Sequence, residues 1–531
     1  MTHDVIDMIH QAAERFPSKI ALSQGSEFYS YTELSESIKA IASNLHKEGM
    51  VPGDRLFFSV RPDPDGILLA LGVVAAGGVL VFADPGTAPE IFNARIKLCN
   101  PRYAAAESLL YFASTKPMAP IVRKKGITMP DYRAIPVEQH FYSGPKLPGT
   151  PRGAISVKKL RRSSDYVSPH TTDPAAESII VFTSGTTADP KCVRHSRNSI
   201  GSGMFSFIDK CGIDQDSYVY TDHFNFGVTA MITGGRWDIP EHPPAKSSRN
   251  FVGALLNRRV THTFLVPADT TLMLNELEKC GIDSDNLHLE VLAMGAAPVL
   301  PALIKRVNRI IPQTKVLSVY GMTEILPIAI VDGADKVNYP DGDLAGKIQE
   351  GITARIDTSG NASGTDDAGE LILSGPGLML GYLGHEAITE HRTGDHARFD
   401  EDGNLVLLGR IKDMLIRANK NIYPGLYESS ISAIEGISAC AIVGVPDKYG
   451  EDIVVLAVVP EDPHQGEKEF RKSIASGLIS SIDGDAQPDV ILVVKEIPLS
   501  GRSSKPDRNE LRLRVAKTYE VQTLLKAHDK D

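Results

Sequence analysis

The stretch "SIIVFTSGTTADPKCV", residues 178–193, decides how the rest of the chain is interpreted. Its apolar start predicts a buried strand, and small or hydroxyl-bearing residues follow directly. Small side chains let backbone N–H groups approach an anion, and Lys191 brings a positive charge close by. We therefore interpret it as a phosphate-binding loop made by Thr183, Ser184, Gly185, Thr186, Thr187 and Lys191. The spacing is not that of a P-loop NTPase, and taken alone the stretch also fits an ordinary polar turn.

Other strands end in similar loops. Apolar runs lead into small or polar residues in "THTFLVP" (261–267), "LEVLAMGAAP" (289–298) and "KVLSVYGMTE" (315–324). Ligands of open parallel sheets bind at the C-terminal ends of the strands, so these loops are expected to converge on one ligand. Upstream, residues 4–16 and 29–49 have helical spacing, and residues 54–60 and 78–83 read as buried strands. This alternation predicts an α/β fold with mostly parallel sheets.

Two details of this reading are specific enough to test. The helix within residues 29–49 is expected to begin in the Thr32-x-x-Ser35 region and to end at Gly49. Between residues 114 and 177 the pattern fades into Pro, Ser, Thr, Lys and Arg. We interpret that segment as a long surface excursion with short strands.

Composition excludes several classes of protein. The 531 residues are 42% hydrophobic and 23% charged, which is typical of a soluble globular protein. A net charge of -10 does not favour nucleic-acid binding, and the basic cluster at 158–162 reads as a solvated loop. The five cysteines are scattered and lack a CxxC pair, which favours a reducing cytoplasmic location. We expect no signal peptide and no membrane span.

Further residue types suit nucleotide chemistry. Tyr320 offers a flat ring on which a base can stack, Thr323 can donate to a phosphate, and Glu324 is an oxygen ligand suited to Mg²⁺. Asp395 follows what reads as a Thr-Gly turn, where a carboxylate can accept from both ribose hydroxyls. Arg410 ends the next strand. Each of these residues alone also has an ordinary structural explanation.

Taken in order, these motifs resemble those of the adenylate-forming superfamily, which includes acyl-CoA synthetases, nonribosomal-peptide adenylation domains and firefly luciferase. The resemblance covers nearly the whole chain. The family's [ST]SG[ST]TGxPKG, YGxTE, TGD, GRxxD and IxPxxxE motifs match residues 183–192, 320–324, 393–395, 409–413 and 422–428. The final GKxxRxxLR motif matches Lys505, Arg508, Leu511 and Arg512. A competing register through Arg502 does not keep Arg at +3 and Leu-Arg at +6 and +7.

The chain departs from the family pattern at four glycine positions. Ala188 and Cys192 replace glycines of the phosphate loop, and each adds a Cβ atom that could stiffen it. Asn419 stands where the family has glycine after the hinge, and Asn tolerates positive φ well. Ser504 precedes Lys505 in place of glycine.

The resemblance implies a large N-terminal domain, residues 1–411, of parallel α/β subdomains and a small β-barrel-like subdomain. A small mobile α+β lid domain, residues 412–531, would follow, with the hinge at Lys412. It also implies a two-step reaction, in which ATP and Mg²⁺ convert a carboxylic acid to an acyl-adenylate and the acyl group then passes to an acceptor. Coenzyme A or a phosphopantetheinyl carrier protein is the expected acceptor.

Residue roles also follow from the resemblance. Lys505 would bridge the carboxylate and the α-phosphate, Thr323 would donate to that phosphate, and Glu324 would hold Mg²⁺. Asp395 and Arg410 would hold the ribose. The adenine and acyl group would be flanked by Tyr320, Gly321 and the loop residues Gly295, Ala296 and Ala297. His223 and Met322 are the candidates for binding the acid.

The acid and the acceptor stay open at this point. Asn225 follows Phe224 where amino-acid adenylation domains usually place Asp, although Asp222 is close by, and His223 resembles a histidine of acyl-CoA synthetases. An acid without an α-amine is therefore favoured over a free-standing amino-acid adenylation enzyme. Asp84-Pro85-Gly86 resembles a turn of β-lactone synthetases, which close a ring on a β-hydroxy acid. A non-catalytic ligand-binding homologue is the remaining alternative.

Overall fold

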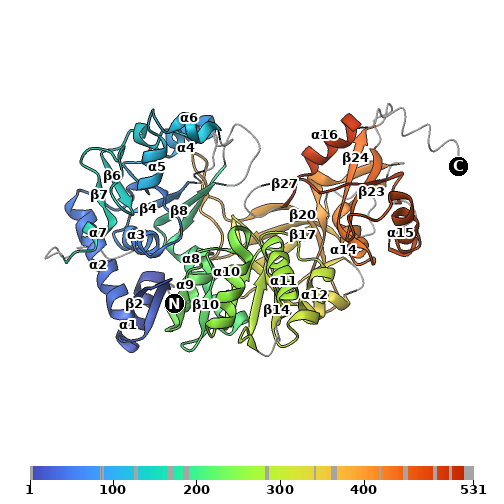
Figure 1. Cartoon of the computed structure of the whole chain (residues 1–531), viewed down its shortest axis with the longest axis horizontal. Coiled ribbons are helices and arrows are strands. Elements are labelled where there is room, and N and C mark those ends of the chain that lie inside the picture. Colours follow the sequence, from blue (N-terminus) through green and yellow to red (C-terminus); the bar gives the residue numbers. More distant parts are fainter. Residues whose placement is uncertain are drawn as a thin grey trace.

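The computed structural model describes thirteen stretches of the chain: residues 4–83, 85, 89–124, 129–163, 173–182, 191–281, 286–339, 342–359, 367–417, 420–446, 452–481, 487–500 and 505–518. Figure 1 shows the C-terminal elements gathered at one end of the molecule and the first sheet with its helices at the other. The large middle part holds the second sheet. The predicted α/β class is confirmed.

Two eight-stranded sheets form the larger part of the molecule. The first has the order β19-β9-β8-β4-β3-β5-β6-β7, and its central strands are parallel. Its strands are β3 (Arg55–Ser59), β4 (Val79–Phe82), β5 (Tyr103–Glu107), β6 (Gln139–Ser143), β7 (Ile155–Ser156), β8 (Glu177–Phe182), β9 (Cys192–Ser196) and β19 (Gly381–Tyr382). The segment expected to be a surface excursion therefore contributes β6 and β7 to this sheet. It also holds the short elements α6 (Ala119–Lys124), η1 (Tyr132–Ala134) and α7 (Val157–Leu160).

The second sheet has the order β15-β14-β13-β12-β10-β11-β1-β2. Its strands are β1 (Ile20–Gln24), β2 (Glu27–Ser30), β10 (Tyr218–Tyr220), β11 (Arg236–Asp238), β12 (His262–Leu265), β13 (Val291–Met294), β14 (Lys315–Met322) and β15 (Ile325–Asp332). Strands β12, β13 and β14 are parallel neighbours. The C-terminal ends of these three strands therefore lie next to one another at one edge of the sheet, as the sequence predicted.

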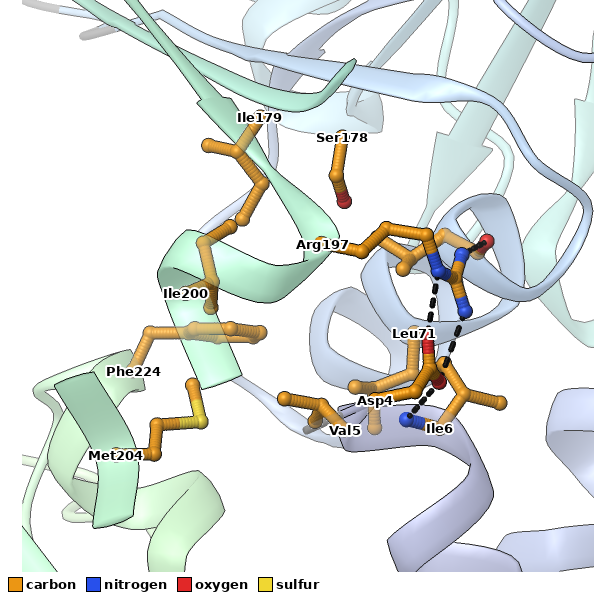
Figure 2. Close-up of a pocket in the computed structure, with 11 residues that line it drawn as sticks. Asp4, Val5, Ile6, Leu71, Ser178, Ile179, Arg197, Ile200, Met204 and Phe224 are labelled. Atoms are coloured by element: carbon orange, nitrogen blue, oxygen red, sulfur yellow. Dashed lines mark hydrogen bonds and ion pairs between the residues drawn. The ribbon is translucent and has the colours of Figure 1, made fainter. Parts of the chain in front are cut away.

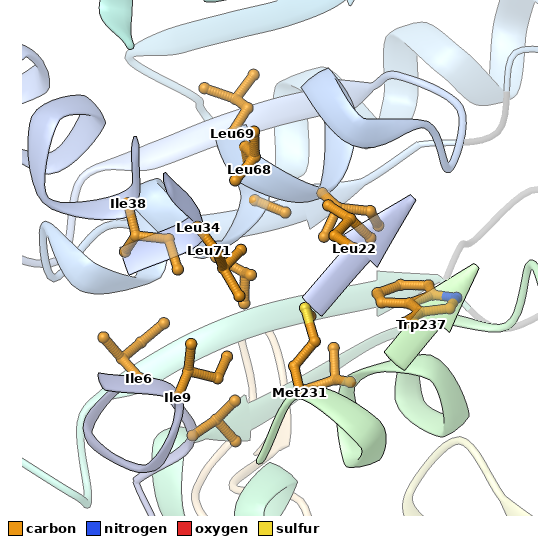
Figure 3. Close-up of a cluster of buried hydrophobic side chains, with 14 of the residues drawn as sticks. Ile6, Ile9, Leu22, Leu34, Ile38, Leu68, Leu69, Leu71, Met231 and Trp237 are labelled. Atoms are coloured by element: carbon orange, nitrogen blue, oxygen red, sulfur yellow. The ribbon is translucent and has the colours of Figure 1, made fainter. Parts of the chain in front are cut away.

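Both sheets are buried on both faces, which explains why their strands read as continuous apolar runs. In β13, Ala293 packs into the core shared by the two sheets, while Leu292 and Met294 pack on the outer face. The shared core is filled by α1 (Val5–Arg15), α2 (Tyr31–Lys47), α3 (Pro64–Ala75), α8 (Arg197–Cys211) and α9 (Phe224–Thr233). Figure 3 shows Leu34, Leu71 and Met231 meeting there. The outer faces carry α4 (Pro89–Cys99), α5 (Ser108–Ala113), α10 (Pro244–Asn257), α11 (Pro267–Cys280) and α12 (Pro301–Ile310).

The N-terminal signals of the helices are local. The residue that caps α2 is Ser30 and not Thr32. Ser30 Oγ accepts a hydrogen bond from Glu33 N, and Glu33 Oε2 accepts one from Ser30 N, which forms a reciprocal capping box. The expected start at Thr32 was therefore wrong by two residues. The expected end is close, since α2 closes at Lys47 and Gly49 takes a left-handed φ of 93°.

The subdomain expected to be barrel-like is a five-stranded antiparallel sheet in the order β16-β21-β20-β18-β17. It comprises β16 (Asp343–Gly346), β17 (Thr353–Asp357), β18 (Gly369–Ser374), β20 (His391–Phe399) and β21 (Leu405–Arg410), and it follows α13 (Gly333–Asn338). The TGD motif lies inside β20 rather than in a turn. Gly394 adopts φ 71° there, so the strand is irregular at the position where the sequence suggested a turn.

The C-terminal part begins after the short turn η3 (Ile411–Asp413). It contains a three-stranded sheet, β24 (Ile437–Pro446), β25 (Asp452–Pro460) and β26 (Val490–Val493), and the helices α14 (Pro424–Ser432), α15 (Glu467–Ser481) and α16 (Arg508–Thr518). The two-stranded pairs are β22 (Leu415–Arg417) with β23 (Lys420–Ile422), and β27 (Leu499–Ser500) with β28 (Lys505–Pro506). Across the described residues, every helix is too short or too polar to span a bilayer.

Candidate active site

The loops after β13 and β14 lie side by side. Met294 pairs with Ser318, so Gly295 comes next to Val319 and the "GAAP" loop comes next to Tyr320. A Cβ atom on Gly295 would be 2.9 Å from the Val319 carbonyl oxygen, which explains why this position is glycine. The following Ala296 has a φ of 65°, which is strained for any residue with a Cβ. The loop is therefore held in a fixed shape against the neighbouring strand.

Tyr320, Asp395 and Arg410 form one hydrogen-bonded unit. The Tyr320 hydroxyl donates to Asp395 Oδ2 at 2.5 Å, and Arg410 Nε lies 2.6 Å from Asp395 Oδ1. Burial and the adjacent Asp395 carboxylate raise the pKa of Tyr320, so its hydroxyl remains a donor at neutral pH. The structure thus brings together three residues that the sequence predicted separately.

The strand geometry fixes that unit. Asp395 and Arg410 are cross-strand partners in the β20–β21 ladder, and Arg410 also donates to the Thr393 carbonyl at 3.0 Å. The Thr393 hydroxyl accepts from Asp395 N at 3.0 Å and donates to the Leu371 carbonyl at 2.8 Å. Only 8% of the Asp395 side chain is exposed, so its carboxylate is directed by its partners and little screened by water.

Thr323 and Glu324 form the two-residue turn between β14 and β15, since Met322 pairs directly with Ile325. Two long-range contacts hold this turn. His195 Nε2 lies 2.7 Å from the Thr323 carbonyl oxygen, and Met379 N donates to the Glu324 carbonyl at 2.8 Å. Burial lowers the pKa of His195, so its neutral ring can donate to Thr323 and accept from the Ser199 hydroxyl, 3.0 Å from Nδ1. Sequence reasoning missed His195.

The Glu324 side chain is held by a residue that the sequence did not single out. The Tyr382 hydroxyl donates to Glu324 Oε1 at 2.7 Å, and Lys191 Nζ lies 5.3 Å from the centre of the Tyr382 ring. Tyr382 is on β19, which pairs with β9 immediately after Lys191. A tyrosine in the sequence "LMLGYLG" carries no chemical signal by itself, so only the fold reveals this contact.

The strands on either side of the predicted phosphate loop pair with each other, since Phe182 at the end of β8 pairs with Cys192 at the start of β9. Thr183, Ser184, Gly185, Thr186, Thr187 and Ala188 themselves lie outside the described residues. Lys191 is described, and its Nζ contacts the ring of Tyr382, the residue whose hydroxyl donates to Glu324.

His391 is the first residue of β20. Burial lowers its pKa, so its ring is neutral near pH 7. Its charge interactions are with four of the predicted site residues, Glu324, Lys191, Arg410 and Asp395. His391 lies two residues before the TGD motif, which could have marked it as a candidate site residue. The sequence analysis did not select it.

Comparison with known proteins identifies the family. The model described as AMP-binding enzyme matches residues 9–383, and the model described as AMP-binding enzyme C-terminal domain matches residues 426–505. The chain belongs to the AMP-binding enzyme family. This places it in the adenylate-forming superfamily, as the order of its motifs predicted.

Two relatives of this AMP-binding enzyme are named as ligases. The salicyl-AMP ligase / salicyl-S-ArCP synthetase of Mycobacterium tuberculosis is 26% identical over 484 residues, or 85% of this chain and 81% of the relative. The mitochondrial medium-chain acyl-CoA ligase of Bos taurus is 26% identical over 540 residues, or 93% of this chain and 85% of the relative. Among solved structures, the amide bond synthetase McbA of Marinactinospora thermotolerans superposes with a TM-score of 0.78 at 21% identity. That alignment covers 96% of this chain and 99% of McbA, and it shows the shared fold.

The acid-binding candidates lie on different elements, since His223 is the residue before α9 and Met322 is the last residue of β14. His223 precedes α9 and packs edge-on against Phe264, with ring centroids 4.7 Å apart. A Cβ atom on Gly295 would be 3.3 Å from Phe264 Cζ, so His223 is connected to the "GAAP" loop through that ring. Met322 packs instead with the core beneath the five-stranded sheet.

The C-terminal motifs of the AMP-binding enzyme meet in one ion cluster. Arg508 Nη1 and Nη2 each lie 2.6 Å from a Glu428 oxygen, and Arg508 Nε is 3.5 Å from Asp413 Oδ2. These contacts tie α16 and α14 to the predicted hinge. Lys412 is exposed on η3, and its role as the hinge stays a prediction. Only the backbone of Lys505 is described, in β28, so the position of its amine stays a prediction.

The groups present suit Mg²⁺ in the way that nucleotide enzymes use it. The part of the chain that the structure describes contains no cluster of three metal-ligating side chains, so it offers no all-protein metal cage. Mg²⁺ commonly takes one or two carboxylates and completes its shell with water and substrate phosphates. Glu324 offers one such carboxylate, and Tyr382 connects it to Lys191 at the end of the predicted phosphate loop.

A small cavity lies apart from these residues. It has a volume of about 30 Å³ and lies among residues of the shared core, including Leu71, Met204 and Phe224. Figure 2 shows Arg197 reaching across it to Asp4, with Arg197 Nη2 donating to Asp4 Oδ1 at 3.0 Å. Asp4 also caps α1. The cavity has room for water but not for a nucleotide, so we assign its ion pair to the attachment of α1.

Proposed function

We propose that this enzyme activates a carboxylic acid with ATP, releases pyrophosphate, and passes the acyl group of the resulting acyl-adenylate to a thiol. Coenzyme A or an acyl carrier protein supplies that thiol. The observation that carries the proposal is the grouping of the Tyr320–Asp395–Arg410 unit with Glu324 and Lys191 around one sheet edge. The relatives named as a salicyl-AMP ligase and an acyl-CoA ligase support both steps.

Each group has a role that its geometry allows. Asp395 accepts from the ribose hydroxyls, Arg410 keeps the Asp395 carboxylate oriented, and Tyr320 stacks on the adenine together with the "GAAP" loop. Lys191 and the phosphate loop hold the β- and γ-phosphates. Glu324 would hold Mg²⁺, and the bound ion would supply positive charge against the departing pyrophosphate.

Negative charge builds on the α-phosphate as the carboxylate oxygen attacks the phosphorus and the bond to pyrophosphate breaks. Positioned donors and cations stabilise that charge, and this electrostatic contribution is the main catalytic effect in phosphoryl-type transfer. Thr323 donates its hydroxyl to the α-phosphate, and His195 keeps the Thr323 backbone in place. Lys505 supplies the cation that bridges the attacking carboxylate and the phosphate.

The region around His223 favours an acid without an α-amine. Burial lowers the pKa of His223, so the ring is neutral near pH 7, and it packs against Phe264, which in turn contacts Phe226 and Phe207. An ammonium group gains nothing from these uncharged rings beyond a weak cation–π attraction. Of the turn Asp84-Pro85-Gly86 that suggested a β-lactone synthetase, Asp84 and Gly86 lie outside the described residues, so that alternative stays untested.

Pyrophosphate exchange into ATP tests the proposal. The purified enzyme is assayed with fatty, aromatic and amino acids, and exchange is expected with a fatty or aromatic acid. Adding coenzyme A should then yield a thioester, whereas a β-lactone or amide product would redirect the second step. Glu324→Gln should abolish exchange, and the exposed Glu350→Gln serves as the matched control. Absence of exchange with every acid would contradict the proposal.

A further inference from the structure

Tyr382 connects the two charged groups that are expected to meet the triphosphate. Its hydroxyl donates to Glu324 Oε1 at 2.7 Å, while its ring lies under Lys191 Nζ at 5.3 Å. Glu324 is on the turn between β14 and β15 of the second sheet, and Lys191 precedes β9 of the first. One side chain therefore spans the junction between the two sheets.

The backbone around Tyr382 is fixed on both sides. Met379 N donates to the Glu324 carbonyl at 2.8 Å, Leu380 N to the Arg194 carbonyl at 2.7 Å, and Leu383 N to the Cys192 carbonyl at 2.8 Å. Tyr382 itself pairs with Val193. Segment 379–383 is thus hydrogen-bonded to the Glu324 turn at its start and to β9 along the rest of its length. A side chain on so constrained a backbone can set the position of another side chain.

The chemistry of the contact suits a metal-binding carboxylate. A hydroxyl that donates to an ionised carboxylate forms a charge-assisted bond, which is stronger than a neutral one and orients the acceptor. A tyrosine hydroxyl is protonated at neutral pH and an ionised carboxylate can only accept, so Tyr382 is the donor in this bond. With Oε1 held by Tyr382, the second Glu324 oxygen is presented in a defined direction. Carboxylates that bind metals are commonly oriented by such partners.

We propose that Tyr382 is a positioning residue that orients Glu324 toward Mg²⁺ through its hydroxyl and places Lys191 on the phosphate side through its ring. This inference rests on the proposed function only for the identity of MgATP as the ligand. The two halves of the side chain have separate partners, so two substitutions can separate their effects. Tyr382→Phe removes the hydroxyl and keeps the ring, whereas Tyr382→Leu removes both.

The matched control is Tyr339→Phe. Tyr339 also donates its hydroxyl to a carboxylate, Asp400 Oδ2 at 3.1 Å, and it is half-buried like Tyr382. It has no role among the nucleotide-binding residues. If removing any tyrosine–carboxylate bond merely loosened the fold, Tyr339→Phe and Tyr382→Phe would have the same effect on ligand binding.

Calorimetry of ATP binding, with Mg²⁺ and separately with EDTA, gives a readout that needs no turnover. We expect Tyr382→Phe to weaken binding of MgATP about tenfold and leave binding of ATP in EDTA unchanged, because only the metal-bound form uses Glu324. Tyr382→Leu should also weaken binding in EDTA about two- to fivefold, because the contact with Lys191 is lost. Tyr339→Phe should match the wild type in both conditions.

Equal loss with Mg²⁺ and with EDTA in Tyr382→Phe would overturn the inference, as would no loss in either. A wild type that binds ATP no better with Mg²⁺ would overturn it as well. Failure of the proposed function gives a different pattern, in which no acid supports pyrophosphate exchange. The Mg²⁺-dependent difference between wild type and Tyr382→Phe would survive that result. In an exchanging enzyme, the Mg²⁺ concentration for half-maximal exchange should rise about tenfold in Tyr382→Phe, with the KM for the acid unchanged.

Discussion

Replacing Asp395 by Asn tests the ribose assignment most directly, because the change keeps the shape of the side chain and alters only its donors and acceptors. A carboxylate offers about four lone-pair sites. Asp395 can therefore accept from Tyr320 on Oδ2 and Arg410 on Oδ1 and still accept from the ribose hydroxyls. An amide has one acceptor oxygen, and Arg410 will take part of it. The variant thus cannot serve both hydroxyls of the ribose.

The size of the effect follows from the bonds lost. A hydrogen bond to a charged group contributes about 1.5–3 kcal/mol, which corresponds to roughly a 10- to 150-fold change in affinity. The wild type should therefore bind ATP about 10- to 150-fold more tightly than 2′-deoxyATP. Asp395→Asn should weaken ATP binding by a similar factor and reduce the preference for ATP over 2′-deoxyATP to about threefold or less.

The assay is equilibrium binding of ATP and of 2′-deoxyATP, each to the wild type and to Asp395→Asn. Asp400→Asn is the control, since Asp400 also accepts from a tyrosine, Tyr339, directly after the same strand β20. It should retain the full preference for ATP. The ribose assignment is refuted if Asp395→Asn still distinguishes the two nucleotides as strongly as the wild type.

The remaining predictions concern other parts of the chain. Lys505→Ala should abolish pyrophosphate exchange and spare thioester formation from a supplied acyl-adenylate; surviving exchange would show that the lysine assignment is wrong. Gly295→Ala should lower the unfolding temperature and raise the KM for ATP, because its Cβ meets the Val319 carbonyl at 2.9 Å and such overpacking costs about 1–3 kcal/mol. Ala296→Gly, which relieves a φ of 65°, should be at least as stable as wild type, and a clear drop in unfolding temperature would contradict the strain argument. Burial lowers the pKa of His10 to about 4, below its usual value near 6.5, so acid favours the unfolded state, and the stability contribution present above pH 6.5 is lost towards pH 4. We expect His10→Gln to reduce that loss of unfolding free energy between pH 6.5 and pH 4 by about 1 kcal/mol. If stability depends on pH in the same way in His10→Gln and in the wild type, this role of His10 is excluded.

The sequence predicted the groups that act through their own chemistry. Asp395, Arg410, Tyr320 and Glu324 carry charge, donors or a flat ring, and the structure joins Tyr320, Asp395 and Arg410 in one hydrogen-bonded unit. Asp395 lies inside β20 rather than at a strand end. The parallel pairing of β12, β13 and β14 agrees with the predicted parallel sheet, whereas the roles of these residues in nucleotide binding stay predictions.

The residues that sequence reasoning missed act through a partner. Tyr382 and His195 hold Glu324 and Thr323, which are 58 and 128 residues away along the chain. Such contacts depend on how β19 and β9 pair at the edge of one sheet and how that edge meets the other. Strand pairing between distant segments leaves no trace in local periodicity. His391 could have been found in part. The sequence shows that it lies close to the TGD motif, but only the structure shows its interactions with four charged groups.

The two altered glycines of the phosphate loop have different consequences. Ala188 lies outside the described residues, so its effect on the loop stays a prediction. Cys192 does not belong to the loop in structural terms, because it is the first residue of β9, is only 1% exposed, and pairs with Phe182. Its thiol is hydrogen-bonded to that of Cys99 in the core outside the first sheet. The Cβ atom at residue 192 therefore packs in the core. Cys192 thus has a packing role in β9, and its effect on the predicted phosphate loop stays a prediction, as does that of Ala188.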